Sequence, residues 1–162
     1  MAAKIYILTG AIQSGKTTKL IQWSNNRNDV FGILTPAMNG KKVFMDANSR
    51  EQFSMEAGPE EKDILTIGRY TFSKTSFEKA ITILQKAIKE KSGWLLVDEI
   101  GPLELRGEGF HNIVKEILNS KTALNILFVI RDTILDEALK FYGLNIKGVT
   151  VIDKDADFLS PL

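Results

Sequence analysis

Residues 5–18 read Ile5-Tyr6-Ile7-Leu8-Thr9-Gly10-Ala11-Ile12-Gln13-Ser14-Gly15-Lys16-Thr17-Thr18, an apolar run that leads directly into a loop with two glycines. Glycine lets backbone N–H groups approach a phosphate chain closely, because no Cβ blocks the way and positive φ angles are accessible. The spacing G-x-x-x-x-G-K-T matches the P-loop pattern, and the apolar run predicts the strand that such a loop follows. The stretch therefore predicts an α/β fold that binds a nucleoside triphosphate.

We expect the whole loop to bind the nucleotide: Gly10, Ala11, Ile12, Gln13, Ser14, Gly15, Lys16, Thr17 and Thr18. Lys16 carries a compact charge that can reach the β- and γ-phosphates, and the Thr17 hydroxyl can ligate the Mg²⁺ that bridges them. From Lys16 to Trp23 the chain is predicted to be helical, with its positive dipole end and free N–H groups facing the anion. The alternative is a glycine-rich turn between a strand and a helix that binds no ligand.

A second run, Trp94-Leu95-Leu96-Val97-Asp98-Glu99, places four apolar residues before two carboxylates. It predicts a parallel strand that is buried on both faces. Such a strand delivers Asp98 to the sheet edge where ligands bind, and there Asp98 suits the shell of a magnesium ion. Because strand side chains alternate, Glu99 points elsewhere and can face the γ-phosphate to orient or deprotonate a water molecule. The alternative for an Asp-Glu pair is a solvated turn.

Length and composition narrow the class of protein. The chain has 162 residues, 44% of them hydrophobic, which predicts a single domain spanning residues 1–162. Its 21 basic and 20 acidic residues leave a net charge of +1, so we expect neither nucleic acid nor a membrane as partner. Cysteine is absent, which excludes disulfides and thiolate metal sites. Without a signal-peptide pattern or an apolar stretch near the roughly 20 residues of a membrane span, we expect a cytoplasmic protein.

Strand-like and helix-like segments alternate along the chain, which is typical of a mainly parallel sheet flanked by helices. The predicted strands are Lys4–Leu8, Val30–Leu34, Trp94–Val97, Asn125–Ile130 and Gly148–Ile152. Two segments repeat apolar residues at the three- and four-residue spacing of a helix with one buried face. They are Phe77, Ala80, Ile81, Leu84 and Ile88, and then Phe110, Ile113, Val114, Ile117 and Leu118. We assign both stripes to core packing and not to a cofactor.

Residues 36–75 interrupt this alternation and predict a small antiparallel β insertion within the domain. Three short β-prone pieces, at Lys42–Met45, Gln52–Met55 and Ile64–Ile67, are separated by polar residues. Asn39-Gly40 and Asn48-Ser49 are typical of turns, so we expect one antiparallel meander. Since the insertion leaves from the carboxyl end of a parallel strand, we hypothesise that it forms a flap over the nucleotide.

Four motifs together resemble the THEP-type family of P-loop nucleoside triphosphatases. They are Gly10–Thr17, Gly32-Ile33-Leu34-Thr35-Pro36, Ile67-Gly68-Arg69-Tyr70, and Val97-Asp98-Glu99-Ile100-Gly101-Pro102-Leu103-Glu104-Leu105. They occur in the family's order and span most of the chain, and the last is the most specific. The resemblance implies a RecA-like P-loop NTPase fold, and Mg²⁺-dependent hydrolysis of nucleoside triphosphates to diphosphates with broad base tolerance.

The resemblance also implies roles for individual residues. The roles argued above fall to Lys16, Thr17, Asp98 and Glu99. The family tends to carry a basic residue just beyond the next core strand, and here Arg131 follows Ile130. An arginine at this position can stabilise charge on the transferred phosphoryl group. The alternative is a strand-end arginine that pairs with Asp132 or a neighbouring acid. Arg69 and Arg106 are weaker candidates for the same role.

Other residues depart from the family pattern or have no assigned chemistry. The C-terminal stretch Thr150–Asp157 lacks the arginine-containing turn of the family, which puts base contacts there in doubt. The same stretch does not match [NT]-K-x-D, the guanine-reading pattern of GTPases, so guanine specificity is unsupported. His111 lies beside the core-facing Phe110 and is expected to be structural. Glu104 is explained by capping or packing as well as by chemistry.

Two other functions use the same loop. A small-molecule or nucleotide kinase needs an acceptor and usually an Arg-rich lid. No such lid is evident, although the insertion contains Lys41, Lys42, Arg50, Lys62 and Arg69. A nucleotide-gated switch orders a loop through the γ-phosphate and responds to a protein partner, which the sequence does not identify. Kinetics separates the three, because a hydrolase releases phosphate alone, a kinase needs its acceptor and a switch accelerates with its partner.

Overall fold

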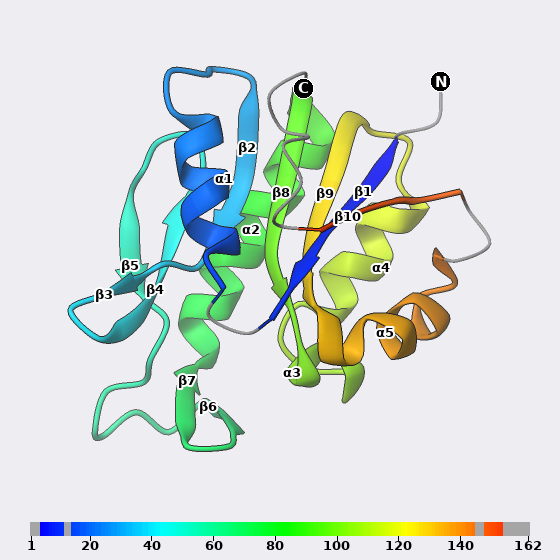
Figure 1. Cartoon of the computed structure of the whole chain (residues 1–162). Helices are drawn as coiled ribbons and strands as arrows, with labels where there is room; N and C mark the ends of the chain where they lie inside the picture. Colours follow the sequence, from blue (N-terminus) through cyan, green and yellow to red (C-terminus); the bar gives the residue numbers. More distant parts are fainter. Residues whose placement is uncertain (1–3, 12–13, 145–147, 154–162) are drawn as a thin grey trace.

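A central sheet organises the computed structural model, which describes residues 4–11, 14–144 and 148–153. In these residues the sheet has eight strands in the order β10-β1-β9-β8-β2-β4-β3, with β5 paired to β4 (Figure 1). Five strands are parallel: β1 (Ile5–Gly10), β2 (Val30–Leu34), β8 (Ser92–Ile100), β9 (Ala123–Arg131) and β10 (Thr150–Asp153). They correspond to the five predicted strands and confirm the mainly parallel α/β sheet. We call the edge where these strands end the carboxyl edge.

The strand β8 is longer than the sequence predicts. The prediction ended it at Val97, whereas the strand continues to Ile100 and therefore includes Asp98 and Glu99. The pairing of β8 with β9 is irregular between Val97 and Ile100, which is where a strand bends and re-aims its side chains. The two carboxylates thus lie within an irregular strand end and not in the turn that follows it.

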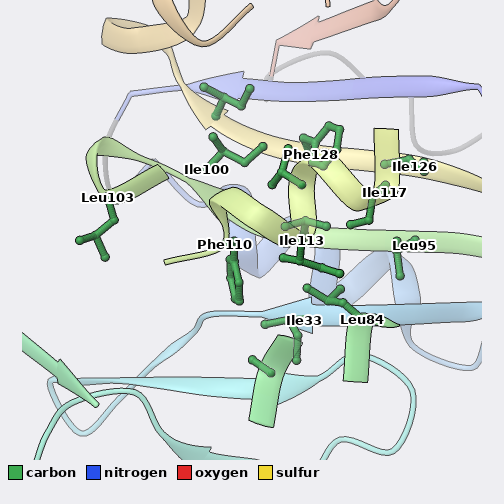
Figure 2. Close-up of a cluster of buried hydrophobic side chains, with 14 of the residues drawn as sticks. Ile33, Leu84, Leu95, Ile100, Leu103, Phe110, Ile113, Ile117, Ile126 and Phe128 are labelled. Carbon is green, nitrogen blue, oxygen red and sulfur yellow. The ribbon is translucent and has the colours of Figure 1, made fainter. Parts of the chain in front are cut away.

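Helices cover both faces of the sheet, and alternating strand side chains supply a hydrophobic cluster to each face. On one face, Leu8 and Leu96 pack with Leu20 of α1 (Lys16–Ser24). The other face is covered by α2 (Lys74–Glu90), α4 (His111–Asn119) and α5 (Leu135–Phe141). Figure 2 shows this larger cluster, in which Phe128 from the sheet lies near Ile113 of α4. Both predicted apolar stripes lie in it, which confirms their packing role.

Two short helical segments lie at the carboxyl edge. They are α3 (Pro102–Leu105), directly after β8, and the 3-10 turn η1 (Asp132–Ile134), directly after β9. Among the helices of the described ranges, none combines the length and the apolar character needed to cross a membrane.

The β insertion forms two units. In the first, β4 (Lys41–Asp46) pairs antiparallel with β2, with β3 (Ala37–Met38) and with β5 (Gln52–Ser54). The predicted turn at Asn39-Gly40 joins β3 to β4, and both residues have positive φ angles. In the predicted turn at Asn48-Ser49, both backbone N–H groups donate to the Asp46 carboxylate. The antiparallel pairing agrees with the prediction, and the structure adds that this unit extends the central sheet beyond β2.

The second unit corrects the prediction of one continuous meander. β6 (Ile64–Ile67) does not pair with β5 but with β7 (Tyr70–Ser73), in a separate two-stranded sheet. Only two residues, Gly68 and Arg69, connect these strands, and Gly68 has a φ angle of 56°. A two-residue hairpin loop with a positive φ angle at its first position favours glycine there. The residues directly after β5 hydrogen-bond to β7 instead: the N–H of Ser73 donates to Met55 O at 3.0 Å, and the N–H of Ala57 donates to Thr71 O at 2.8 Å. The strand β7 and not β6 therefore lies next to them.

Candidate active site

The first part of the candidate site is the loop between β1 and α1. The Lys16 side chain is 5% exposed, and its ammonium group donates to the carbonyl oxygens of Gly10 at 3.2 Å and Ala11 at 2.7 Å. It also lies 3.5 Å from the hydroxyl of Ser14. The ammonium is therefore held in the middle of the loop by the loop's own oxygen atoms.

The remaining loop positions follow the strand–loop–helix arrangement that the motif predicts. The N–H of Lys19 donates to Gly15 O at 3.0 Å, which closes the first turn of α1. Thr18 is exposed on that turn. Ile12 and Gln13, which we expect to contact the nucleotide, lie outside the described residues.

Thr17 and Asp98 meet although 81 positions separate them in the chain. The Thr17 hydroxyl donates to Asp98 Oδ2 at 2.6 Å, and the N–H of Thr35, just after β2, donates to the same oxygen at 3.1 Å. Asp98 is only 1% exposed, and burial raises the pKa of its carboxyl group. The hydrogen bonds from Thr17 and Thr35 and the positive charge of Lys42 act in the opposite direction, while the charge of Glu99 adds to the rise. Two oxygen atoms that suit a hard cation therefore lie side by side at the carboxyl edge.

Glu99 and Arg131 form the second pair at this edge. An Arg131 Nη2 atom lies 3.5 Å from Glu99 Oε1, and both side chains are about a quarter exposed, at 23% and 24%. Arg131 is the last residue of β9 and is in register with Gly10 on β1, so this pair adjoins the start of the phosphate-binding loop. Arg131 thus pairs with a neighbouring acid, Glu99, while its role toward the transferred phosphoryl group stays a prediction.

Glu104 is buried behind this pair and connects the two ends of a loop. It is 3% exposed; its Oε1 accepts the N–H of Gly101 at 2.7 Å and its Oε2 accepts the N–H of Phe110 at 2.9 Å. Burial raises the pKa of Glu104 to about 7, against the effect of these hydrogen bonds, and the charge of Glu99 adds to the rise. Of the explanations that the sequence left open, capping and packing describe these contacts.

The weaker candidates have other partners. Arg106 donates to the carbonyl oxygen of Thr66 on β6 at 2.7 Å and pairs with Glu108 at 3.0 Å. Arg69 donates to the hydroxyl of Tyr70 at 3.2 Å. His111 begins α4, and its Nδ1 lies 3.0 Å from the hydroxyl of Tyr142.

The contacts described above place five of the predicted site residues along the carboxyl edge: Lys16, Thr17, Asp98, Glu99 and Arg131.

Sequence reasoning missed two contributors to this region. The first is the Thr35 N–H, whose contact with Asp98 follows from the pairing of β2 beside β8. The second is the link of Lys42 to Asp98: the sequence names Lys42 only among the basic residues of the insertion, whereas in the structure its charge acts on Asp98. Neither has a local sequence signal, because each reaches the site through strand pairing.

Comparison with known proteins finds similarity along most of the chain. A family model described as NTPase matches residues 5–159. The nucleoside-triphosphatase THEP1 of Saccharolobus solfataricus is 29% identical, over 96% of this chain and 88% of the relative. The protein of the same name from Methanopyrus kandleri is 25% identical, over 78% of this chain and 72% of the relative.

Two solved structures share the fold. The crystal structure of THEP1 from the hyperthermophile Aquifex aeolicus aligns with a TM-score of 0.71 at 19% identity, covering 97% of this chain and 95% of that one. The solution structure of a human cancer-related nucleoside triphosphatase aligns with a TM-score of 0.67 at 24% identity, covering 99% and 93%. Since the family model covers nearly the whole sequence and the phosphate-binding loop lies where that fold requires it, the chain belongs to the NTPase family and is a P-loop nucleoside-triphosphate hydrolase.

Proposed function

We propose that the enzyme hydrolyses nucleoside triphosphates to diphosphates and phosphate with Mg²⁺ as cofactor, and that it accepts several bases. The observation that carries this proposal is the contact of Thr17 and Asp98 at 2.6 Å, next to the loop that holds Lys16. The nearby Glu99–Arg131 pair supplies a base and a cation at the same edge.

The residues at this edge fit a magnesium ion. Mg²⁺ prefers hard oxygen ligands, and in phosphoryl-transfer sites it takes one or two from the protein and the rest from phosphates and water. Thr17 Oγ1 and Asp98 Oδ2 are two such oxygens, already in contact. The ion, when bound, neutralises charge that develops on the β- and γ-phosphates.

The proposed reaction breaks the bond between the γ-phosphorus and the oxygen that bridges it to the β-phosphate. The oxygen of a water molecule attacks the γ-phosphorus, its proton passes to Glu99, and the bridging oxygen leaves on the diphosphate. Lys16 holds the β- and γ-phosphates, while Arg131 stabilises negative charge on the transferred group. The 3.5 Å separation from Glu99 is long for a hydrogen bond, so Arg131 can exchange this partner for a phosphate oxygen at small cost.

Broad base tolerance follows from where the binding energy arises. The groups assigned above all address phosphates or the metal, and phosphate contacts are the same for every base. The sequence also lacks the [NT]-K-x-D pattern that reads guanine.

We place the enzyme in the cytoplasm, where nucleoside triphosphates and Mg²⁺ are both abundant.

The test is phosphate release from the purified protein with ATP, GTP, CTP and UTP in turn, with and without Mg²⁺. Release of phosphate from several nucleotides only with Mg²⁺ would support the proposal. Release from one nucleotide alone would contradict broad base tolerance.

A Glu99→Gln variant should bind nucleotide normally while kcat falls roughly 10²–10⁴-fold, the usual contribution of a general base. Lys16→Ala should lose binding and turnover together. Phosphate transfer that depends on an added acceptor would favour the kinase alternative.

A further inference from the structure

Lys42 reaches the carboxyl edge from the β insertion. The strand β4 runs antiparallel to β2, with Met45 opposite Leu34, the last residue of β2. Lys42 comes three residues before Met45, so at a rise of about 3.4 Å per residue it lies roughly 10 Å beyond the end of β2. The next residue after β2, Thr35, donates to Asp98. The backbone of Lys42 therefore lies beyond the edge at which the proposed catalytic residues gather.

The position of Lys42 is held by its backbone. Its N–H donates to the Glu56 carboxylate at 2.7 Å, and its carbonyl oxygen accepts the N–H of Met55 at 3.2 Å. These contacts fix the start of β4. A side chain on a fixed backbone loses less conformational entropy when it binds a ligand than one on a mobile loop.

The side chain of Lys42 lies over an aromatic ring that carries a second cation. Its ammonium is 5.6 Å from the ring centre of Tyr70, and the Arg69 guanidinium is 5.2 Å from the same ring. Tyr70 stacks on Phe72, with ring centres 5.5 Å apart, and Phe72 is buried in the core. Contact with a ring face does not use the N–H donors of an ammonium group, so they can still bind an anion.

The hairpin that carries Tyr70 is itself joined to the site. Arg106, which follows α3, donates to Thr66 O of β6 at 2.7 Å. In Figure 1 the β6–β7 hairpin and α3 both lie at the lower end of the molecule. The hairpin and β4 thus bring two cations toward an edge that holds two acidic side chains.

We propose that Lys42 binds the terminal phosphate of the nucleoside triphosphate, with Arg69 as a second cation beside it. The insertion then distinguishes a triphosphate from a diphosphate, because only the triphosphate extends to Lys42. The proposal deepens the proposed function and rests on it. The proposal also gives a function to the β insertion, which the sequence analysis describes as a flap over the nucleotide. In it, Lys42 and Arg69 contact the γ-phosphate from the side opposite the phosphate-binding loop.

The experiment compares Lys42→Met with Lys41→Met. Methionine keeps a long apolar side chain against Tyr70 and removes the charge, while Lys41 is the exposed lysine next to it on the same strand. Binding of a non-hydrolysable ATP analogue with a β,γ-imido bridge, and of ADP, is measured with Mg²⁺ by calorimetry. Lys42→Met should weaken the analogue about 10- to 100-fold, the loss of one hydrogen bond between charged groups, and ADP less than about twofold. Lys41→Met should change neither.

An equal loss for the analogue and for ADP, or no loss for either, would overturn the assignment of Lys42. Arg69→Gln, on the exposed tip of the hairpin, gives a second variant that does not depend on the folding of β4. It should weaken the analogue several-fold and leave ADP unchanged. The result is independent of the catalytic assignment: full activity in Glu99→Gln would remove Glu99 from the mechanism, whereas the ratio of the two affinities still decides the role of Lys42.

Discussion

The negative charge of the Glu104 carboxylate is unfavourable in the folded protein, because the side chain is buried. Its two oxygens accept the N–H groups of Gly101 and Phe110, yet burial outweighs these bonds and raises its pKa from 4.5 to about 7. Glu99 contributes a second negative charge, and the Tyr142 hydroxyl donates to the carbonyl oxygen of Glu104 at 3.4 Å. The folded protein therefore binds a proton at Glu104 that the unfolded chain releases at lower pH.

This difference predicts how stability depends on pH. Between pH 4.5 and about 7 the folded state holds more protons at Glu104 than the unfolded state, so the free energy of unfolding falls as the pH rises. The stabilising contribution is complete below pH 4.5 and lost above about 7, a difference on the order of 3 kcal/mol at 1.36 kcal/mol per pKa unit. Urea unfolding at several pH values should show a shallower fall in Glu104→Gln than in the wild type.

The exposed Glu90, at the end of α2, provides the control. Glu90→Gln should keep the pH dependence of the wild type, because the charge on an exposed carboxylate is solvated in both states. Asp98 contributes to the pH dependence in all three proteins, and comparing them removes its effect. Identical curves for the wild type and Glu104→Gln would show that Glu104 does not hold its proton more tightly in the folded state.

At the scale of secondary-structure elements, the close approach of β2 to β8 sets the distance between the insertion and the strand that carries Asp98. Gly32 of β2 is opposite Leu96 of β8 and has a φ angle of 110°. A Cβ atom at this position would overlap the backbone of Leu96. Only glycine therefore allows β2 to bring Thr35 to Asp98.

Replacing Gly32 should separate these two strands. We expect Gly32→Ala to lower the free energy of unfolding by about 3 kcal/mol or more, because strain from the positive φ angle adds to the clash with Leu96. Gly58→Ala is the matched control, since a Cβ atom there meets no atom within 4 Å, and its effect should be below about 0.5 kcal/mol. Denaturant unfolding measures both. Equal stability of the two variants would mean that β2 can move away from β8 without cost.

At the scale of the whole molecule, the insertion and the α/β sheet share one hydrophobic cluster. Phe44 of β4 lies 5.0 Å from Phe77 of α2 and 5.8 Å from Phe110, measured between ring centres. Leu65 and Phe72 of the hairpin are buried in the same cluster. Elements that share a core lose their contacts together when any one of them opens.

We therefore propose that the chain unfolds as one domain, as its length and composition predict. Native-state hydrogen exchange should give backbone amides of β4 the same opening free energy as those of β8, because both depend on global unfolding. Amides of α5, which packs against β9, provide a comparison outside the insertion. Opening of β4 well below the denaturant concentration that opens β8 would show that the insertion is a separate folding unit.

The sequence by itself determined the local elements of the protein. The glycine spacing before Lys16, the apolar quartet before Asp98 and the helical stripes each encode a backbone conformation through neighbouring residues, and the structure has all three. The length of β8 and the partner of β6 were predicted wrongly, since both depend on which strand lies alongside. Only the tertiary structure decided that Glu99 meets Arg131 and that β4 runs alongside β2, which places Lys42 beyond the end of β2. Strand order and register bring these residues together, and both are set by packing between distant parts of the chain, which no local pattern records.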